Sequence, residues 1–476
     1  MDGATILAVA GVVVLIAEVA GIWLAIRAIM SVRTPQGAVA WSVSLVAMPL
    51  IAVPLYLVFG RERFHGDVDA RRAIEGEVRS ALADQVQAAH ESVLVSERRA
   101  GLAVLARLAE LPFSRGNATE LLIDGEATFG AIFAAIDAAE RFVLVQFFIV
   151  RDDGLGRELK ARLEARARAG VAVHFLYDEI GCHALPPAYV RDLRAAGVQA
   201  SAFNTTRGSR NRFQLNFRNH RKIVVIDGMT AFIGGHNVGD EYMGRSARFG
   251  AWRDTHVRIT GPAALAAQLA FTEDWDWATR QVLELDWPLV AAPDGDRTIL
   301  ILPSGPADAF ETCGLFFADA IHAARQRLWI ASPYFVPDSK IVSALQLAAL
   351  RGVDVRIMLP ARPDHYLVYL ASFASIPAAR QAGVRFFRYD AGFLHQKVML
   401  VDDVAVVGTA NLDNRSFRLN FEVSVVVDDT EFAAEVQAML ERDFANCHET
   451  TADDFARRPL AFRVAVRAAN LMAPIL

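Results

Sequence analysis

The sequence predicts an α/β protein of two similar halves in a pseudo-twofold arrangement, preceded by an N-terminal hairpin of two transmembrane helices. Three observations predict this fold. Hydrophobic residues concentrate at the N-terminus, short β-branched runs alternate with helical patterns after residue 112, and one succession of motifs occurs twice. Of the 476 residues, 53% are hydrophobic and 22% charged, with a net charge of −5. This composition excludes a disordered chain, and the acidic balance argues against a non-specific nucleic-acid binder.

The hydrophobic excess lies in residues 1–60, of which 42 are hydrophobic. Two apolar stretches, 4–26 and 37–60, are each long enough to cross a hydrocarbon core about 30 Å thick. We therefore expect a transmembrane hairpin over residues 1–62. A cleaved signal peptide is the poorer interpretation, because no basic segment precedes the first stretch and a second stretch follows at once. More arginines follow the hairpin than lie in its loop, so the positive-inside rule places the large C-terminal part in the cytoplasm.

The rest of the chain divides into a connector, two halves and a tail. Residues 63–112 have helical spacing and are predicted to form a helical connector, and the halves are expected over 113–290 and 291–458. Each half should contain a strand, a helix and two further strands in the same order. These elements are expected at 142–150, 159–169, 171–177 and 223–226, and again at 328–332, 341–351, 353–359 and 398–401. Residues 459–476 are predicted to form an amphipathic tail that either lies on the membrane surface or packs on the domain.

The cysteines and the other metal-binding residue types predict no cofactor. Cys182, Cys313 and Cys447 lie far apart and are odd in number, which argues against a disulfide framework and predicts reduced thiols. No pair or cluster of His, Cys or acidic residues has the spacing of a metal site, so we expect neither a metal nor another cofactor.

One set of residues suited to catalysis occurs in each half. His220, Lys222 and Asp227 have the same spacing as His395, Lys397 and Asp402. Alternation along a strand places the His and the Lys of each motif on one face, so each strand delivers an imidazole and an ammonium group to one cavity. A single histidine on an apolar strand is more often a core residue. A matched set in both halves argues for a shared site.

Small residues followed by asparagine come after each motif. Asn237 ends the first such stretch and Asn411 the second, and Gly235 in the first stands where Thr409 stands in the second. Close backbone N–H groups and side-chain amides suit phosphate oxygens, so we expect Asn237, Asn411 and Thr409 to bind a phosphate.

These paired motifs resemble those of the phospholipase D superfamily, and within it the chain resembles the bacterial cardiolipin synthases. The resemblance covers nearly the whole chain, and the stretches that carry it are 237–244, 252–256, 304–306, 332–337 and 415–422, besides the N-terminal hairpin and the C-terminal tail. One departure is visible. Six residues separate Asp227 from Gly234 but only five separate Asp402 from Gly408, so the second hairpin turn should be one residue shorter.

The resemblance implies a mechanism and roles for the site residues. In the usual order of the superfamily, His220 would attack phosphorus to form a phosphatidyl-histidine, while His395 would protonate the leaving alcohol and then deprotonate the incoming one. The residues themselves leave open which histidine attacks. The lysines and asparagines would stabilise the phosphate oxygens. From position along the chain rather than from the resemblance, Glu422, 27 residues past His395, is the candidate to orient that histidine, and Asp254 is the candidate to serve His220. Asp227 and Asp402 are expected to brace their hairpins.

The implied reaction joins two phosphatidylglycerol molecules into cardiolipin and releases glycerol. Two enzymatic alternatives remain open, a phospholipase D-type hydrolase and a synthase that takes its phosphatidyl group from another phospholipid. A non-catalytic membrane scaffold is the third hypothesis, although both motifs are intact. The expected partners are phosphatidylglycerol, other membrane lipids and the bilayer, without nucleic acid. The expected location is the bacterial inner membrane, crossed more than once.

Overall fold

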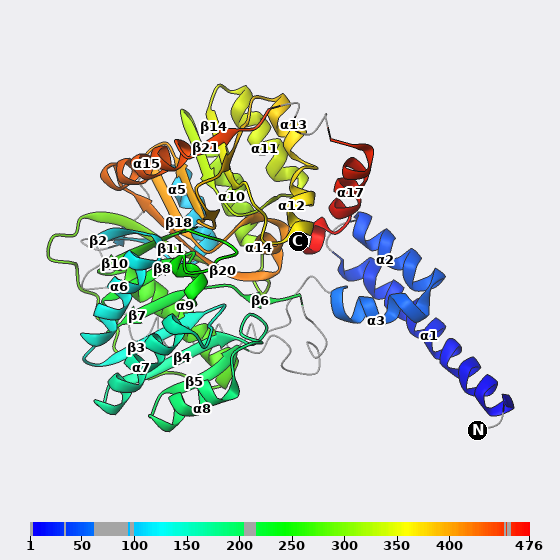
Figure 1. Cartoon of the computed structure of the whole chain (residues 1–476), viewed down its shortest axis with the longest axis horizontal. Coiled ribbons are helices and arrows are strands. Elements are labelled where there is room, and N and C mark those ends of the chain that lie inside the picture. The colour runs from blue at the N-terminus through cyan, green and yellow to red at the C-terminus, as the bar shows by residue number, and fades with distance from the viewer. Residues whose placement is uncertain are drawn as a thin grey trace.

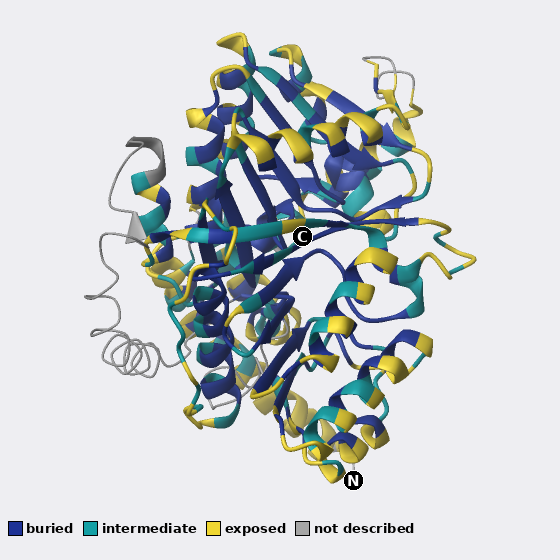
Figure 2. Ribbon diagram, turned by 90° about the vertical axis from the view of Figure 1, so that its left-hand side faces the viewer, coloured by how far each residue is buried: buried dark blue, intermediate teal, exposed yellow. Residues whose placement is uncertain are grey.

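The computed structural model describes residues 3–32, 35–60, 94–95, 100–203, 216–451, 454 and 458–476. An α/β body carries a projecting group of N-terminal helices (Figure 1). Strands are buried inside the body, and the covering helices expose their outer faces (Figure 2). Most of the expected connector lies outside the described residues, which include its β1 (Leu94–Val95), the helix α5 (Ala100–Ala109) and residues 110–112.

The two halves contain equivalent elements in the same order. The first half contains β2 (Phe113–Ile123), α6 (Asp124–Asp137), β3 (Phe142–Phe147), α7 (Gly154–Arg168), β4 (Ala172–Asp178), α8 (Pro187–Ala195), β5 (Gln199–Phe203), β6 (Arg218–Asn219), β7 (Ile223–Ile226), β8 (Thr230–Gly234), η1 (Asp240–Met243), β9 (Trp252–Arg253), β10 (Thr255–Thr260) and α9 (Ala263–Thr279). The second half contains β11 (Arg297–Ser304), α10 (Thr312–Ala323), β12 (Arg327–Ala331), β13 (Phe335–Val336), α11 (Ser339–Leu350), β14 (Asp354–Pro360), α12 (Tyr366–Ser372), α13 (Ile376–Gln381), β15 (Arg385–Tyr389), β16 (Phe393–Leu394), β17 (Val398–Val401), β18 (Val404–Gly408), β19 (Leu412–Asp413), α14 (Asn414–Arg418), β20 (Asn420–Asp428), α15 (Thr430–Phe444) and β21 (Cys447–Glu449).

Strand pairing follows one plan in both halves. The order is β5-β4-β3-β7-β8-β10-β2 in the first half and β15-β14-β12-β17-β18-β20-β11 in the second. The first three strands of each order are parallel, and the remaining neighbours are antiparallel. β2 and β11 pair with each other and join the halves. The duplication predicted from the motifs is therefore confirmed as one topology used twice.

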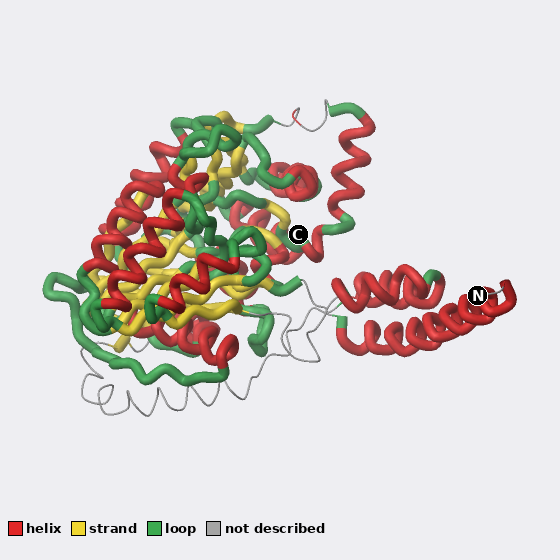
Figure 3. The backbone as a smooth tube through the Cα atoms, turned by 60° about the horizontal axis from the view of Figure 1, so that its bottom comes forward, coloured by secondary structure: helices red, strands yellow, loops and turns green. Residues whose placement is uncertain are grey.

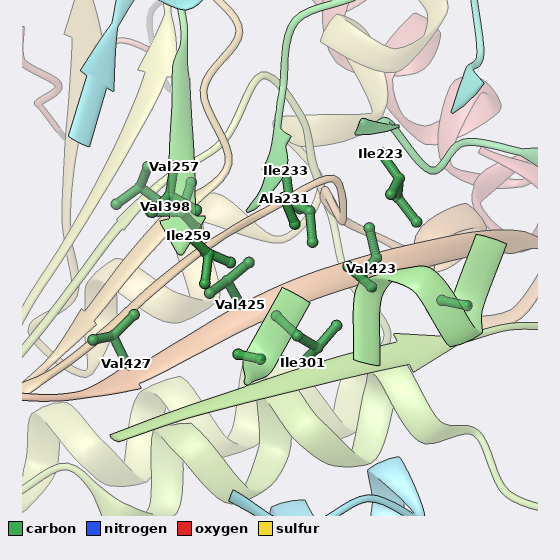
Figure 4. Close-up of a cluster of buried hydrophobic side chains, with 14 of the residues drawn as sticks. Ile223, Ala231, Ile233, Val257, Ile259, Ile301, Val398, Val423, Val425 and Val427 are labelled. Atoms are coloured by element: carbon green, nitrogen blue, oxygen red, sulfur yellow. The ribbon is translucent and has the colours of Figure 1, made fainter. Parts of the chain in front are cut away.

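The hydrophobic core holds the halves in a fixed relation. Helices α6, α7 and α8 pack on the outer face of the first sheet, and α10, α11 and α13 on that of the second. A third cluster contains strands of both halves together with α9 and α15, and Figure 4 shows Val257 and Ile259 of the first half near Val425 and Val427 of the second. Strands covered on both faces read as continuous apolar runs, which is why β7 and β17 were predictable from sequence with the correct bounds.

One predicted strand is too long. The sequence suggested a strand over 142–150, but β3 ends at Phe147. Beyond it the chain bends, and the backbone N–H of Ile149 donates a hydrogen bond to Asn237 Oδ1 at 3.1 Å. The apolar run continues past the strand because its last residues pack near the site.

The N-terminal segment forms three helices, α1 (Gly3–Ser31), α2 (Pro35–Ala47) and α3 (Pro49–Phe59). Only α1 is long and apolar enough to cross a membrane among the residues that the structure describes. The second apolar stretch breaks at Met48, because Pro49 has no N–H for a continuous helix and disfavours helical geometry in the residue before it. The resulting helices are roughly 20 and 16 Å long at 1.5 Å per residue, each shorter than the hydrocarbon core.

α3 folds back beside α2 instead of extending it. The rings of Trp41 and Tyr56 lie 5.1 Å apart, which a single straight helix over both residues excludes. Gly21 permits the α2–α3 turn to pack closely on α1, since a Cβ there would lie 2.4 Å from the Leu45 carbonyl oxygen. The expectation of two complete spans is therefore not confirmed. α1 extends beyond its two short neighbours, with the N-terminus far from the body (Figure 3).

The C-terminal tail packs on the second half. It forms α17 (Leu460–Asn470) and η2 (Ala473–Ile475). Val466 and Ala469 of α17 are buried in a cluster with Leu370 and Ala371 of α12. The tail therefore packs on the domain, which is one of the two alternatives expected from the sequence.

Candidate active site

The two histidine motifs meet where the halves cross. β6 pairs in parallel with the start of β20, and β16 pairs in parallel with β9. The backbone N–H of His220 donates to the carbonyl of Phe421 (2.9 Å), and that of His395 donates to the carbonyl of Arg253 (2.8 Å). Each histidine is thus held by the backbone of the other half, at the residue directly before an acidic side chain.

Each imidazole is paired with the carboxylate of the opposite half. His220 Nδ1 lies 2.9 Å from Glu422 Oε2, and His395 Nδ1 lies 2.7 Å from Asp254 Oδ2. This corrects the sequence-based assignment, which gave Glu422 to His395 and Asp254 to His220. That assignment followed nearness along the chain, whereas the strands exchange partners at the interface. A carboxylate accepts from Nδ1–H, so Nε2 of each histidine keeps its lone pair.

Burial and charge set the protonation of the histidines. Burial lowers the pKa of His220 and of His395 to about 4, although the paired carboxylates and their hydrogen bonds oppose this effect. Both imidazoles are therefore neutral at neutral pH. A neutral imidazole with a free Nε2 lone pair has the form that a nucleophile requires.

The two lysines lie beside the histidines and are almost fully buried. Lys222 Nζ donates to the His220 carbonyl at 2.6 Å, and Lys397 Nζ donates to the His395 carbonyl and lies 3.1 Å from His395 Nε2. Burial lowers the pKa of Lys222 to about 7 and that of Lys397 to about 8, against the opposing attraction of Glu422 and Asp254. The site therefore concentrates cationic groups that an entering anion would stabilise.

Glu422 is held by a dense network of donors. Its carboxylate accepts from Thr409 Oγ1 (2.6 Å), Ser416 Oγ (2.8 Å) and Asn420 Nδ2 (3.0 Å), besides His220. Burial acts to raise the pKa of Glu422, but His220, Lys222 and the hydrogen bond from Thr409 outweigh it, so the pKa lies below its ordinary value. Glu422 is therefore an ionised acceptor with a fixed orientation.

Asp254 has a different environment. It accepts from the backbone N–H of Thr255 (2.8 Å), and its own backbone N–H donates to Asp124 Oδ1 (3.2 Å). Burial acts to raise the pKa of Asp254, but His236, His395 and Lys397 outweigh it and lower that pKa. His236 and His256 are also buried, and their Nδ1 atoms lie 3.2 Å apart.

The three residues expected to bind phosphate lie in different settings. Asn237 accepts from Ile149 and its Nδ2 lies 3.3 Å from the Tyr242 hydroxyl, whereas Asn411 Oδ1 is buried without a hydrogen-bond partner among the described residues. The Thr409 hydroxyl donates to Glu422, so its hydrogen bond orients the carboxylate. The equivalent Gly235 leaves no room for a side chain, since a Cβ would lie 2.0 Å from Asp254 Oδ1.

Asp227 and Asp402 brace the hairpins that follow the motifs. Each adopts a left-handed backbone conformation, with φ of 53° and 51°. Asp227 accepts from the backbone N–H groups of residues 140–142, and Asp402 accepts from those of residues 325–327. β7 and β8 are joined by three residues and β17 and β18 by two, which agrees with the shorter second turn expected from sequence.

Aromatic rings around the histidines were not found from sequence. Phe148 lies 5.0 Å from the ring of His220, and Trp252 lies 5.1 Å from that of His395. Tyr242 also packs on Trp252, at 4.8 Å. Trp252 stands two residues before Asp254, and Phe148 directly follows a buried strand. These positions in the sequence were the only indication that the two rings lie at the site. These rings provide an apolar wall near the reacting nitrogens.

A second layer fixes the site from behind. Arg253 forms two hydrogen bonds of 2.8 Å with the carboxylate of Asp443, which also accepts from Gln396. Arg221 donates to Asp274 Oδ1 at 3.0 Å. Both ion pairs are buried. Arg221 directly follows His220, and Arg253 directly precedes Asp254. Their acidic partners lie on α9 and α15, so these two helices hold the motif strands in place.

Comparison with known proteins agrees with this geometry. The family model "Cardiolipin synthase, PLD-like domain" matches residues 132–269 and 317–444, and "Phospholipase_D-nuclease N-terminal" matches 19–61. Cardiolipin synthase A of Pseudomonas aeruginosa is 52% identical over 468 residues, which cover 96% of this chain and 94% of that protein. The same-named protein of Pseudomonas fluorescens is 50% identical over 462 residues, or 96% of each chain.

A solved structure shares the fold. The phosphatidylserine synthase of Haemophilus influenzae superposes with a TM-score of 0.58 at 16% identity, over 79% of this chain and 100% of that one. The family-model matches fall on the two halves that contain the histidine motifs, and the curated relatives extend over almost the entire length. The chain therefore belongs to the cardiolipin synthase family of the phospholipase D superfamily.

Proposed function

We propose that the protein is a membrane-bound phosphatidyltransferase that converts two phosphatidylglycerol molecules into cardiolipin and glycerol. The observation that carries this proposal is the pair of buried imidazoles, each oriented through Nδ1 by the acidic residue of the other half. Two oriented imidazoles, one to attack and one to move protons, are what exchange of one phosphodiester for another requires. The relatives named cardiolipin synthase A support this choice of lipid.

In the first step, His220 Nε2 attacks the phosphorus of the donor lipid. The phosphorus–oxygen bond to glycerol breaks, and His395 supplies the proton that the leaving glycerol needs. In the second step, His395 takes the proton from a hydroxyl of the acceptor phosphatidylglycerol, whose oxygen displaces His220. Bonds and protons balance over the two steps, so the exchange consumes no nucleotide. We assign His220 as the nucleophile because the first histidine has this role in the superfamily. This assignment fits the four hydrogen bonds that hold Glu422, the carboxylate that orients His220.

Charge makes the histidines capable of both roles. Before lipid enters, their pKa of about 4 keeps them neutral, which suits attack by His220. A phosphodiester anion bound between them favours the protonated form of His395, because an opposite charge nearby raises the pKa of an imidazole. Lys222 and Lys397 stabilise the anionic oxygens as charge develops on them.

The chain is membrane-associated, and we propose that α1 is its one complete crossing, with the catalytic part at the cytoplasmic face of the inner membrane. α2 and α3 would enter and leave on that face. This topology puts every arginine near the anchor on the cytoplasmic side, in agreement with the positive-inside rule. These residues are Arg27, Arg33, Arg61, Arg63, Arg71 and Arg72, against no Lys or Arg before α1.

Product analysis tests the function. Purified protein in detergent micelles with phosphatidylglycerol alone is expected to produce cardiolipin and glycerol in equal amounts, measured by mass spectrometry. His220→Ala is the matched inactive control. Phosphatidic acid in place of cardiolipin would identify a hydrolase instead. Cardiolipin formed only after addition of a second phospholipid would identify another donor.

A further inference from the structure

The amphipathic helix α17 has two apolar faces, and its own domain covers only one. The buried face consists of Val466 and Ala469, with the ring of Phe462 packed 5.4 Å from that of Phe373. A surface helix that only packs on its domain needs one apolar stripe and presents a polar opposite face. The opposite face of α17 is not polar.

Leu460, Val464 and Leu471 form an exposed stripe at helical spacing on that opposite face. Their side chains are 67%, 58% and 80% exposed. Neighbouring α12 adds Tyr366 and Leu367, which are also exposed. We call these five residues the α12–α17 surface. Exposed apolar residues gathered on two neighbouring helices mark an interaction site more often than a chance exposure.

The charges beside this surface favour an anionic partner. Arg463 and Arg467 are exposed on α17 and flank the stripe, and Arg458 precedes the helix. An apolar stripe bordered by arginines matches the boundary between acyl chains and anionic head groups, where the side chain of arginine reaches the phosphates while its neighbours enter the apolar layer.

The position of the surface matches that partner. α17 and α12 lie at the end of the body from which α1–α3 project, whereas α7 lies at the far end (Figures 1 and 3). A bilayer crossed by α1 therefore lies at the end of the body where α12 and α17 lie (Figure 1). A second soluble protein would need no such alignment with the anchor.

Hydrogen bonds connect the segments that carry this surface to the body and to the anchor. Asp364, two residues before α12, accepts from the hydroxyl of Tyr334 and through its carbonyl from Arg248 (3.3 Å). At the other end, the backbone N–H of Arg415 donates to the carbonyl of Leu476, and the Arg415 side chain donates to the carbonyl of Asn216 (2.6 Å). Asn216 in turn donates to the carbonyl of Phe59 at the end of the anchor (2.9 Å).

We propose that the α12–α17 surface is a second membrane contact, which inserts into the anionic interface of the bilayer that α1 crosses. Together with the anchor it fixes the tilt of the body, so that the histidine site stays at the level of lipid head groups. This proposal rests on the membrane location of the proposed function and adds how the site meets lipid that remains in the bilayer.

Spin-label accessibility tests the contact directly in the full-length chain. Val464→Cys carries a nitroxide, Cys447 is replaced by Ser, and the protein is reconstituted in vesicles of phosphatidylglycerol and phosphatidylethanolamine. Ala161→Cys, exposed on α7, is the matched control. The label at 464 is expected to collide more with oxygen than with a water-soluble nickel chelate, and the label at 161 should show the opposite order. Equal nickel accessibility at both positions would overturn the proposal, as would protection of position 464 with spin–spin broadening from a second chain.

A kinetic comparison gives an independent readout. Val464→Glu changes a side chain that does not pack on the domain, so folding is expected to persist, and Ala161→Glu controls for added charge. The variant at 464 is expected to lose about tenfold in initial rate on vesicles, in line with the loss of one inserted apolar side chain. Its rate on short-chain phosphatidylglycerol dissolved as monomers should be unchanged. Equal rates on vesicles for both variants would contradict the proposal. If no variant makes cardiolipin on any substrate, the proposed function fails while the spin-label result still decides the contact.

Discussion

Glu422→Gln keeps the shape of the side chain that orients His220 and removes its charge. The carboxylate accepts four hydrogen bonds, from His220 Nδ1, Thr409, Ser416 and Asn420, at distances of 2.6 to 3.0 Å. An amide offers one acceptor oxygen and two N–H donors. Its nitrogen cannot accept from any of these groups. If it faces Nδ1, it selects the tautomer in which Nε2 is protonated and has no lone pair for attack.

The expected loss is large because both charge and tautomer change. A hydrogen bond to a charged group contributes about 1.5–3 kcal/mol. The equivalent acid-to-amide change in a Ser-His-Asp triad lowers kcat about 10⁴-fold through the wrong tautomer. We therefore expect Glu422→Gln to lower kcat by about 10³- to 10⁴-fold, or about 4–5.5 kcal/mol of transition-state stabilisation.

A substrate with an activated leaving group separates the two histidines. Phosphatidyl-p-nitrophenol releases its phenolate without protonation, so the first step no longer needs the general acid. Asp254→Asn, which perturbs His395, is expected to be slow with phosphatidylglycerol but to release nitrophenolate at close to the wild-type rate in the first turnover. Glu422→Gln should be slow with both substrates. The assay is stopped-flow absorbance under single-turnover conditions.

The reverse pattern would refute the reasoning. Rescue of Glu422→Gln and not of Asp254→Asn by the activated substrate means that Glu422 serves the acid–base histidine. His220→Ala and His395→Ala then show whether the cross-pairing or the choice of nucleophile is at fault. If the two alanine variants follow their cross-paired carboxylate variants, the pairing stands and the two histidines exchange roles.

Three other outcomes follow from the structure. Gly3→Cys is expected to react with a membrane-impermeant maleimide outside intact cells, and reaction only after permeabilisation would restore the two-span hairpin. Gly235→Ala should lower stability by roughly 1–3 kcal/mol in thermal unfolding and reduce kcat, because the new Cβ would meet Asp254 Oδ1 at 2.0 Å; an unchanged melting temperature and rate would contradict this. In pH-rate profiles with phosphatidyl-p-nitrophenol, which needs no general acid, kcat/KM should rise through about pH 4 as His220 loses its proton, and fall above about pH 7 as Lys222 loses the charge that binds phosphate. Activity that keeps rising well above that range would exclude the role given to Lys222.

Sequence patterns located the fold because duplication is visible in spacing. Buried strands such as β7 and β17 have no polar residues to interrupt them, and the histidine motifs mark equivalent strands in both halves. The break at Met48 was also encoded, since Pro49 and Pro54 lie within the second apolar stretch and neither can continue a helix without loss. Hydropathy alone measures the length of the apolar stretch and does not take these prolines into account.

The pairing of the acidic residues could not be read in the same way. Spacing along one chain ranks Glu422 as a neighbour of His395, 27 residues away, whereas its contact is with His220 in the other half. Only the parallel pairings of β6 with β20 and of β9 with β16 bring each histidine to the opposite carboxylate. Those pairings are tertiary, and the short strands that form them leave little pattern in sequence.

The cross-pairing also predicts that neither half can act alone. If each half oriented its own histidine, a separated half would still contain a histidine with its carboxylate. The interface would then serve only to bring the two histidine–carboxylate pairs close together. Here His220 depends on the second half for its carboxylate and for its backbone acceptor, and His395 depends on the first half for the same two contacts. A displacement of one half therefore removes the orientation of both imidazoles together. This couples the geometry of the reacting groups to the shared hydrophobic core, so loss of packing between the halves should reduce the rate before it unfolds the protein.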